Sequence, residues 1–200
     1  MLAPTIYKQI KKRLINLAGA KMRRVVQAMD DMDTPVTVSM LHAYMTENGM
    51  TKVSNSAISM QLNFMLKQGY LVKTDPPEGA KRPVGGKWVF YTFSPHRHQW
   101  DNLISHLPAI RVLASVRANE IVQKIWDRPY LQSVSPADIY FTHDRFKQSR
   151  EIISQDFARL RKVGIVERSH KEGSKVFFSL KRDNIKAITA CIEYFFEHLQ

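Results

Sequence analysis

The 200-residue sequence predicts a mainly α-helical protein with small β-hairpins, an α+β fold built from two copies of one plan. Three observations predict this class. A helical pattern that begins at a serine and stops at a glycine occurs at residues 54–72 and again at 149–167. A β-branched and aromatic segment follows each copy, as expected of a hairpin strand. Most of the remaining chain carries apolar residues at helical spacing.

The two copies read SNSAISMQLNFMLKQGYLV and SREIISQDFARLRKVGIVE, and they align at a constant offset of 95 positions. Serine is a preferred first residue of a helix, and glycine readily adopts the left-handed backbone that ends one. In the first copy Ile58, Leu62 and Met65 are spaced by four and three residues, which predicts a buried helix face. The identical pairs are Ser54 and Ser149, Ile58 and Ile153, Ser59 and Ser154, Lys67 and Lys162, and Gly69 and Gly164.

Two shorter helices precede the first copy. Residues 25–29 predict one, which ends in the polar cluster before Pro35, and residues 40–45 predict the next, with Ser39 as its N-cap. A polar loop over 74–86 and the aromatic strand 87–93 complete a hairpin. Segments 121–125, 134–139 and 173–180 repeat these features in the same order. Three helices followed by a hairpin is the order of a winged helix-turn-helix module, so the sequence predicts two such modules in tandem.

The expected organisation has five parts. Residues 1–20 form a basic amphipathic helix, 21–94 the first module, 95–113 a linker whose helix is interrupted at Pro108, 114–182 the second module, and 183–200 a C-terminal helix. The apolar face of the last helix must pack against the connecting helix or against a second chain. Both alternatives stay open, so a homodimer is one expectation. The packing residues are Ile188, Ile192, Phe195, Phe196 and Leu199.

The charge of the chain points to a polyanionic partner. Its formal net charge is +12 and its pI is about 9.9, which favours nucleic acid over a membrane surface. Cys191 is the only cysteine, so an internal disulfide is excluded and a reducing compartment is expected. No apolar run is long enough to span a bilayer. We therefore expect a cytoplasmic protein without a membrane partner, associated with the nucleoid if it is a bacterial regulator.

The repeated stretch resembles the recognition-helix signature of ArsR-type winged helix-turn-helix transcriptional regulators, and more loosely that of MarR-type regulators. The ArsR pattern is roughly V-S-x-H-L-x-x-L-x-x-x-G-L-V, and the sequence from Ile58 to Val72 follows it with Gln61 in place of histidine. The resemblance implies double-stranded DNA as the partner. It departs from the family in two ways, because two modules share one chain and because the Cys-x-Cys pair of the metal-sensing members is missing.

In the module geometry, the third helix enters the major groove and the wing contacts phosphate or the minor groove. Amide and hydroxyl side chains can read base edges, whereas cations grip phosphate. Glu151 and Asp156 would weaken a phosphate contact of the second module. The expected DNA contacts of the first module are Asn55, Ser56, Ser59, Met60, Asn63, Lys81, Arg82 and Lys87. Those of the second module are Ser149, Arg150, Ser154, Gln155, Arg159, Lys171 and Lys175.

The resulting hypothesis is a sequence-specific DNA-binding transcriptional regulator. The alternatives are a tandem winged-helix scaffold, which would be expected to be acidic or neutral, and a plasmid or phage replication or partition protein that also binds DNA. No nucleophile motif or phosphate-cradling glycine loop predicts an enzyme. His96, His98 and His106 lie near the linker without matching ligands, so no metal and no cofactor are expected. The sequence identifies no effector.

Overall fold

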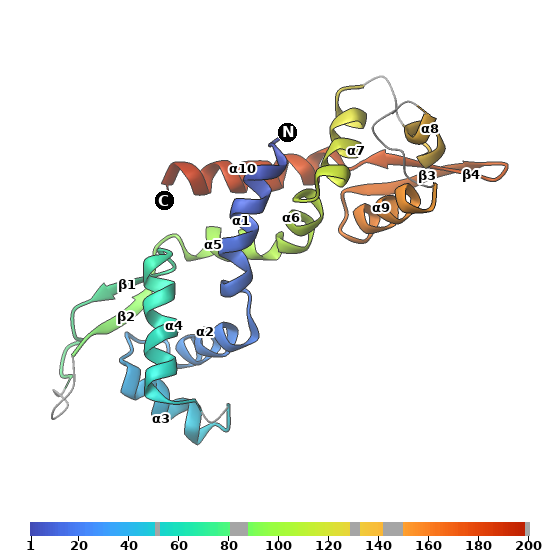
Figure 1. The fold of residues 1–200 in the computed structure, drawn as a ribbon. Coiled ribbons are helices and arrows are strands. Elements are labelled where there is room, and N and C mark those ends of the chain that lie inside the picture. The colour runs from blue at the N-terminus through green and yellow to red at the C-terminus, as the bar shows by residue number, and fades with distance from the viewer. Residues whose placement is uncertain (51–52, 81–87, 129–132, 142–149, 199–200) are drawn as a thin grey trace. The chain divides into compact units, whose positions relative to one another are not determined.

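The structure, a computed structural model, describes residues 1–50, 53–80, 88–128, 133–141 and 150–198. It is mainly helical, with 63% of the chain in helices, and it contains two small antiparallel sheets, so the α+β class is confirmed (Figure 1). The elements in chain order are α1 (Pro4–Leu17), α2 (Ala20–Met32), α3 (Val38–Glu47), α4 (Asn55–Lys67), β1 (Leu71–Thr74), β2 (Phe90–Phe93), α5 (Arg97–Ser105), α6 (Leu107–Leu113), α7 (Val116–Trp126), α8 (Pro136–Phe141), α9 (Arg150–Lys162), β3 (Val166–Glu172), β4 (Lys175–Leu180) and α10 (Arg182–His198).

The order of three helices followed by a hairpin occurs twice, as α2-α3-α4-β1-β2 and as α7-α8-α9-β3-β4. Each hairpin is a separate two-stranded antiparallel sheet. In each copy one residue before the middle helix forms an isolated antiparallel bridge to the second strand of the hairpin. These bridges join Val36 to Tyr91 and Val134 to Phe178. Equivalent bridges at equivalent places extend the internal repeat from sequence to backbone pairing.

Local capping sets the helix boundaries in the first copy. The Oγ1 atom of Thr37 accepts a hydrogen bond of 3.2 Å from the backbone N–H of Met40, so α3 begins at Val38. The prediction that Ser39 caps this helix is wrong, because Ser39 already lies inside it. The predicted cap of the next helix is confirmed, since Ser54 Oγ accepts from the N–H of Ala57 at 3.3 Å. Both hydroxyls satisfy a donor that the first helical turn leaves without an intrahelical partner.

The glycine stops are also present at both copies. Gly69 has a φ of 73° and Gly164 a φ of 71°, both in the left-handed region that other residues rarely adopt. The N–H of Tyr70 and the N–H of Ile165 then bond back to Met65 and Leu160 at 3.0 and 2.9 Å. These bonds close each helix and turn the chain into the hairpin.

The chain divides into two compact units. One contains residues 1–12 and 105–193, and the other contains 13–104 and 194–200. Each unit therefore holds one helix and hairpin copy, but the boundaries differ from the five expected parts. The division falls between Ile104 and Ser105 within the expected linker, and each terminal helix contributes residues to both units.

The connecting segment contains α5 and α6, with the break at His106. Pro108 lies in the first turn of α6, where its missing N–H leaves no intrahelical bond unmade, so the predicted interruption is confirmed. Arg97 of α5 donates to Asp30 of α2 at 2.7 Å and to Asp101 at 3.2 Å. Its guanidinium also lies 3.7 Å from the ring centroid of Phe93. These contacts fix α5 against α2 and β2 of the same unit.

The predicted apolar face of the C-terminal helix α10 is buried within the chain. Ile188, Ile192 and Phe195 are no more than 2% exposed. The Phe195 ring meets Trp100 of α5 edge to face, with centroids 4.8 Å apart. Phe196 is half-buried, and Leu199 lies outside the described residues. For Phe195, the contact with Trp100 of α5 agrees with the first of the two expected alternatives, packing on the connecting helix. No described helix is long and apolar enough to cross a membrane.

Candidate nucleic-acid interface

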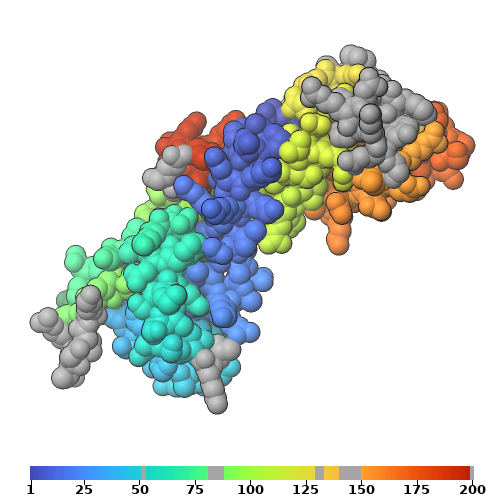
Figure 2. All heavy atoms as spheres, in the orientation of Figure 1, coloured from blue at the N-terminus to red at the C-terminus, as the bar shows by residue number. Residues whose placement is uncertain are grey.

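The outer face of α4 carries the polar side chains that the sequence predicted for the first copy. Asn55, Ser56, Met60 and Asn63 are exposed, and Ser59 is half-buried. Met60 is an unusually exposed apolar residue, at 72%. Figure 2 shows atoms of α4, in teal, at the surface of the unit that contains this helix.

The opposite face of α4 anchors the helix. Ile58, Leu62 and Met65 have no exposed surface, as their spacing predicted. Asn63 donates to Ser59 Oγ at 3.5 Å along the helix, which orders two of the predicted contact residues relative to one another. The face presents hydroxyl and amide groups rather than charge, and these are groups suited to base edges.

The predicted wing contacts of the first copy, Lys81, Arg82 and Lys87, lie outside the described residues. The described part of this hairpin is short, with four paired residues in each strand. Within it, Lys73 of β1 is exposed and adds a cation that the sequence reasoning did not select.

The second copy gathers positive charge in a hollow of about 520 Å³ between α8, α9 and the β3–β4 hairpin. Arg150 and Arg161 line it from α9, and Arg168 and Lys175 line it from the hairpin. Arg150 and Arg161 share a helix face because eleven residues make about three turns. None of the described residues that line the hollow is acidic. The other lining residues are Ser135, Pro136, Ala137, Ser154, Ser174, Val176 and Phe178.

Phe178 links this hollow to the core of its unit. Its ring lies 5.0 Å from that of Phe157 on α9, and its backbone bridges to Val134 with hydrogen bonds of 2.8 and 2.9 Å. These contacts hold the hairpin, the start of α8 and α9 in one arrangement. The four cationic side chains are thus carried on elements that contact one another.

Two carboxylates of the β3–β4 hairpin have partners that do not line the hollow. Lys181 pairs with Glu167 at 3.1 Å, and His170 lies 3.5 Å from Glu172. The expectation that Asp156 weakens a phosphate contact is wrong, because its carboxylate is 1% exposed and accepts two hydrogen bonds from Arg117 of α7. The same bond raises the pKa of the Arg117 guanidinium. Asp156 therefore serves the interior of its unit.

Of the residues predicted for the second copy, the structure brings together Arg150, Ser154 and Lys175. Gln155, Arg159 and Lys171 are exposed but do not line the hollow. On α9, Gln155 and Arg159 project from a different side than Arg150, since they are offset from it by about 140° and 180° around the helix. Ser149 lies outside the described residues.

Arg168 is a cationic lining residue that the expected contacts do not include. It sits opposite Phe178 in the hairpin register. The internal repeat could have identified Arg168. The offset of 95 that aligns the two copies also aligns Arg168 with Lys73, the exposed cation of the first hairpin.

Neither a metal site among the described residues nor a similar known protein adds to the description of this interface. Among the described residues, no group of three or more histidine, cysteine or acidic side chains is placed to hold a metal ion. No protein-family model, curated protein or solved structure matches the chain.

Proposed function

We propose that this protein is a sequence-specific double-stranded DNA-binding regulator of transcription that uses two tandem winged helix-turn-helix modules. In this proposal α4 and α9 enter the major groove, and the hairpins act as wings on phosphate or the minor groove. The observation that carries the proposal is the hollow between α9 and its hairpin, where four cationic side chains meet without a carboxylate among the described lining residues.

In this proposal the two modules have different roles in DNA binding. The outer face of α4 offers Asn55 and Asn63, which can pair with adenine edges. The hollow of the second module offers charge, which supplies affinity without sequence preference. A regulator that needs both specificity and affinity can obtain them from two such modules in one chain, and the net charge of +12 agrees with a DNA partner.

The phosphate contacts are tested by the salt dependence of DNA binding. Arg161→Ala with Arg168→Ala removes two cations of the hollow. The control, Lys8→Ala with Lys186→Ala, removes two exposed cations elsewhere. The affinity of a 30-base-pair duplex is measured over a range of salt concentrations. The slope of the logarithm of the affinity against the logarithm of the salt concentration is then compared. The first variant should flatten this slope by about 0.9 for each phosphate that the protein no longer neutralises, and the control should leave it unchanged. Equal slopes for both variants would exclude phosphate binding by the hollow.

The reading of sequence is tested by selecting bound duplexes from a random pool and measuring the affinity of the selected site. Asn55→Ala and Asn63→Ala should each cost about 1–3 kcal/mol on that site and leave binding to unrelated DNA nearly unchanged. Failure to enrich any sequence with the wild-type chain would exclude sequence-specific binding.

A further inference from the structure

The repeat allows the two modules to be compared position by position, and one buried contact differs between them. In the second module Arg117 of α7 donates two hydrogen bonds to Asp156 of α9. The aligned segments Val25-Val-Gln and Ile121-Val-Gln place Lys21 opposite Arg117, and the offset of 95 places Gln61 opposite Asp156. The first module therefore has a lysine and an amide where the second has a buried ion pair.

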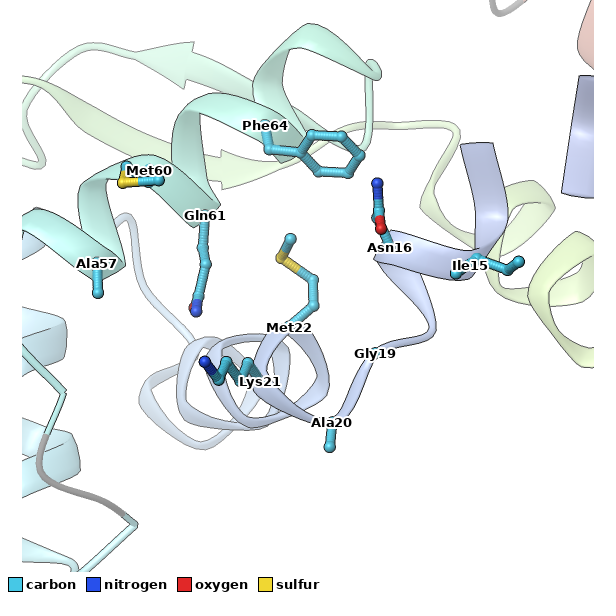
Figure 3. Close-up of a pocket in the computed structure, with 10 residues that line it drawn as sticks. All are labelled: Ile15, Asn16, Gly19, Ala20, Lys21, Met22, Ala57, Met60, Gln61 and Phe64. Atoms are coloured by element: carbon cyan, nitrogen blue, oxygen red, sulfur yellow. The ribbon is translucent and has the colours of Figure 1, made fainter. Parts of the chain in front are cut away.

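The amide leaves hydrogen-bonding capacity unused. Gln61 Oε1 is buried and has no hydrogen-bond partner in the part of the chain that the structure describes. A buried acceptor without a hydrogen bond has lost its contact with water and gained none in return, which is unfavourable. Figure 3 shows the Gln61 side chain reaching from α4 toward Lys21 on α2. A bound molecule that donates a hydrogen bond here would remove that cost.

A hollow lies beside this amide. It measures about 530 Å³, in the range of small-molecule sites, and it is framed by the end of α1, the start of α2 and α4. Ile15, Met22, Met60 and Phe64 supply most of its apolar wall. In Figure 3 the Met22 and Phe64 side chains point into this space. Its lining is predominantly apolar, so an apolar group would displace water from it favourably.

A second hollow of about 370 Å³ adjoins the first and shares Lys21, Ala57 and Gln61 with it. Arg24 lines only this second hollow. Lys21 and Arg24 therefore place two cations at the second hollow, and none of the described residues that line either hollow is acidic. The site combines an apolar wall, a hydrogen-bond acceptor and positive charge.

We propose that the first module binds a small amphiphilic carboxylate at this place. Its apolar chain fills the larger hollow, an N–H or O–H donor meets Gln61 Oε1, and its carboxylate faces Lys21 and Arg24. N-acyl amino acids have these three groups in this order. The ligand occupies in the first module the place that the Arg117–Asp156 pair closes in the second. This site does not depend on whether the protein binds DNA.

The test is calorimetric titration of the full-length chain with N-octanoylglycine, which carries a chain, an amide N–H and a carboxylate. Octanoylglycine methyl ester lacks the charge, and decanoate lacks the donor. One molecule of octanoylglycine should bind per chain, and each of the other two should bind several-fold more weakly. Absence of binding, or equal affinity for all three compounds, would overturn the proposal.

Two variants locate the binding. Lys21→Arg with Gln61→Asp installs the ion pair of the second module and should weaken octanoylglycine at least tenfold. Gln61→Leu removes the side-chain amide, and with it the Oε1 acceptor, and it should weaken octanoylglycine two- to tenfold while sparing decanoate. Lys67→Ala, at an exposed position on α4 outside both hollows, is the control. Circular dichroism verifies folding of each variant. Unchanged affinity in the folded Gln61→Leu protein would place the ligand elsewhere and overturn the proposal.

Discussion

Arg117 and Asp156 form a bidentate ion pair that joins the first and third helices of the second module. The Asp156 side chain is 2% exposed and the Arg117 side chain 26%. Arg159 also approaches Asp156, at 3.6 Å, from the solvent side of the same helix. A carboxylate buried this completely must be paired, since an isolated charge in the interior is strongly unfavourable.

Arg117→Met should therefore lower the free energy of unfolding by about 3 kcal/mol, near the lower limit for breaking a buried pair, because Arg117 is partly exposed and Arg159 remains nearby. Adding Asp156→Leu should restore much of the loss, because an apolar pair of similar size leaves no charge unpaired. Urea unfolding of the two single variants and the double variant measures the coupling. A loss below about 1 kcal/mol in both single variants would show that the pair is not structurally important.

The contact between Trp100 and Phe195 predicts a second effect on stability. Phe195 is 1% exposed and packs edge to face on a completely buried ring. Phe195→Ala should cost about 3–5 kcal/mol, as expected for an aromatic side chain removed from a core. Thermal unfolding measures the loss, with the exposed Glu197→Ala as control. Sedimentation of the folded fraction should give an unchanged mass. A smaller species at retained stability would instead assign Phe195 to an interface between chains.

The two glycine stops predict matched backbone effects. Gly69 and Gly164 have nearly equal positive φ angles, and a Cβ at Gly69 would meet no atom within 4 Å. Alanine at either site should cost about 1–2 kcal/mol from backbone strain alone. Asparagine, which tolerates this conformation better, should cost less. Chemical unfolding of the four variants checks the order. Equal stability of the alanine variants and wild type would mean that the helices can end differently.

A Cβ added at Gly164, unlike one added at Gly69, would contact the side chain of Asn184. Its side-chain amide donates to the carbonyl of Gly164 at 2.8 Å, and its nitrogen would lie 3.4 Å from an added Cβ. Asn184→Ala should therefore destabilise the second module by about 1 kcal/mol, the usual net contribution of one hydrogen bond. Asn184 lies in the unit that contains α9, so the unfolding of the unit that contains α4 should be unaffected. Hydrogen exchange of the Gly69 and Gly164 regions separates the two responses.

His106 predicts a dependence of stability on pH. It lies half-buried between α5 and α6, and burial lowers its pKa below the ordinary value of 6.5. The folded state therefore holds fewer protons than the unfolded state as the pH falls below 6.5, and the protein loses stability in that window. The stability that depends on a neutral His106 ring is fully present above pH 6.5. His106→Gln should reduce this loss, as measured by urea midpoints between about pH 7.5 and 5.5. The reverse slope would show that the protonated ring is stabilised in the fold.

Sequence patterns predicted the strongest local features correctly. The cap at Ser54, the stops at Gly69 and Gly164, and the buried side of α4 all follow from a few neighbouring residues, so no distant contact was needed to find them. One local prediction failed where two hydroxyl residues competed for the same role. Thr37, not Ser39, caps α3, because a hydroxyl two residues earlier can reach the same first turn.

The sites depend on contacts that local patterns do not contain. The cationic hollow unites Arg150 and Arg161 with Arg168 and Lys175 because the hairpin register and the Phe157–Phe178 contact hold strand against helix. Asp156 was expected at the surface because a charged residue on a polar helix usually lies there. Its burial depends on Arg117, which is 39 residues away in sequence.

The sequence alone determined the class of fold, the internal repeat and the excess of positive charge, since these follow from residue types and their periodic spacing. Only the tertiary structure decided how Lys21 and Gln61 in one module and Arg117 and Asp156 in the other are used. Each pair comes from two helices separated by other elements, and packing between those helices determines whether the position is closed by an ion pair or stays open beside a hollow. That difference distinguishes the two helix-and-hairpin copies.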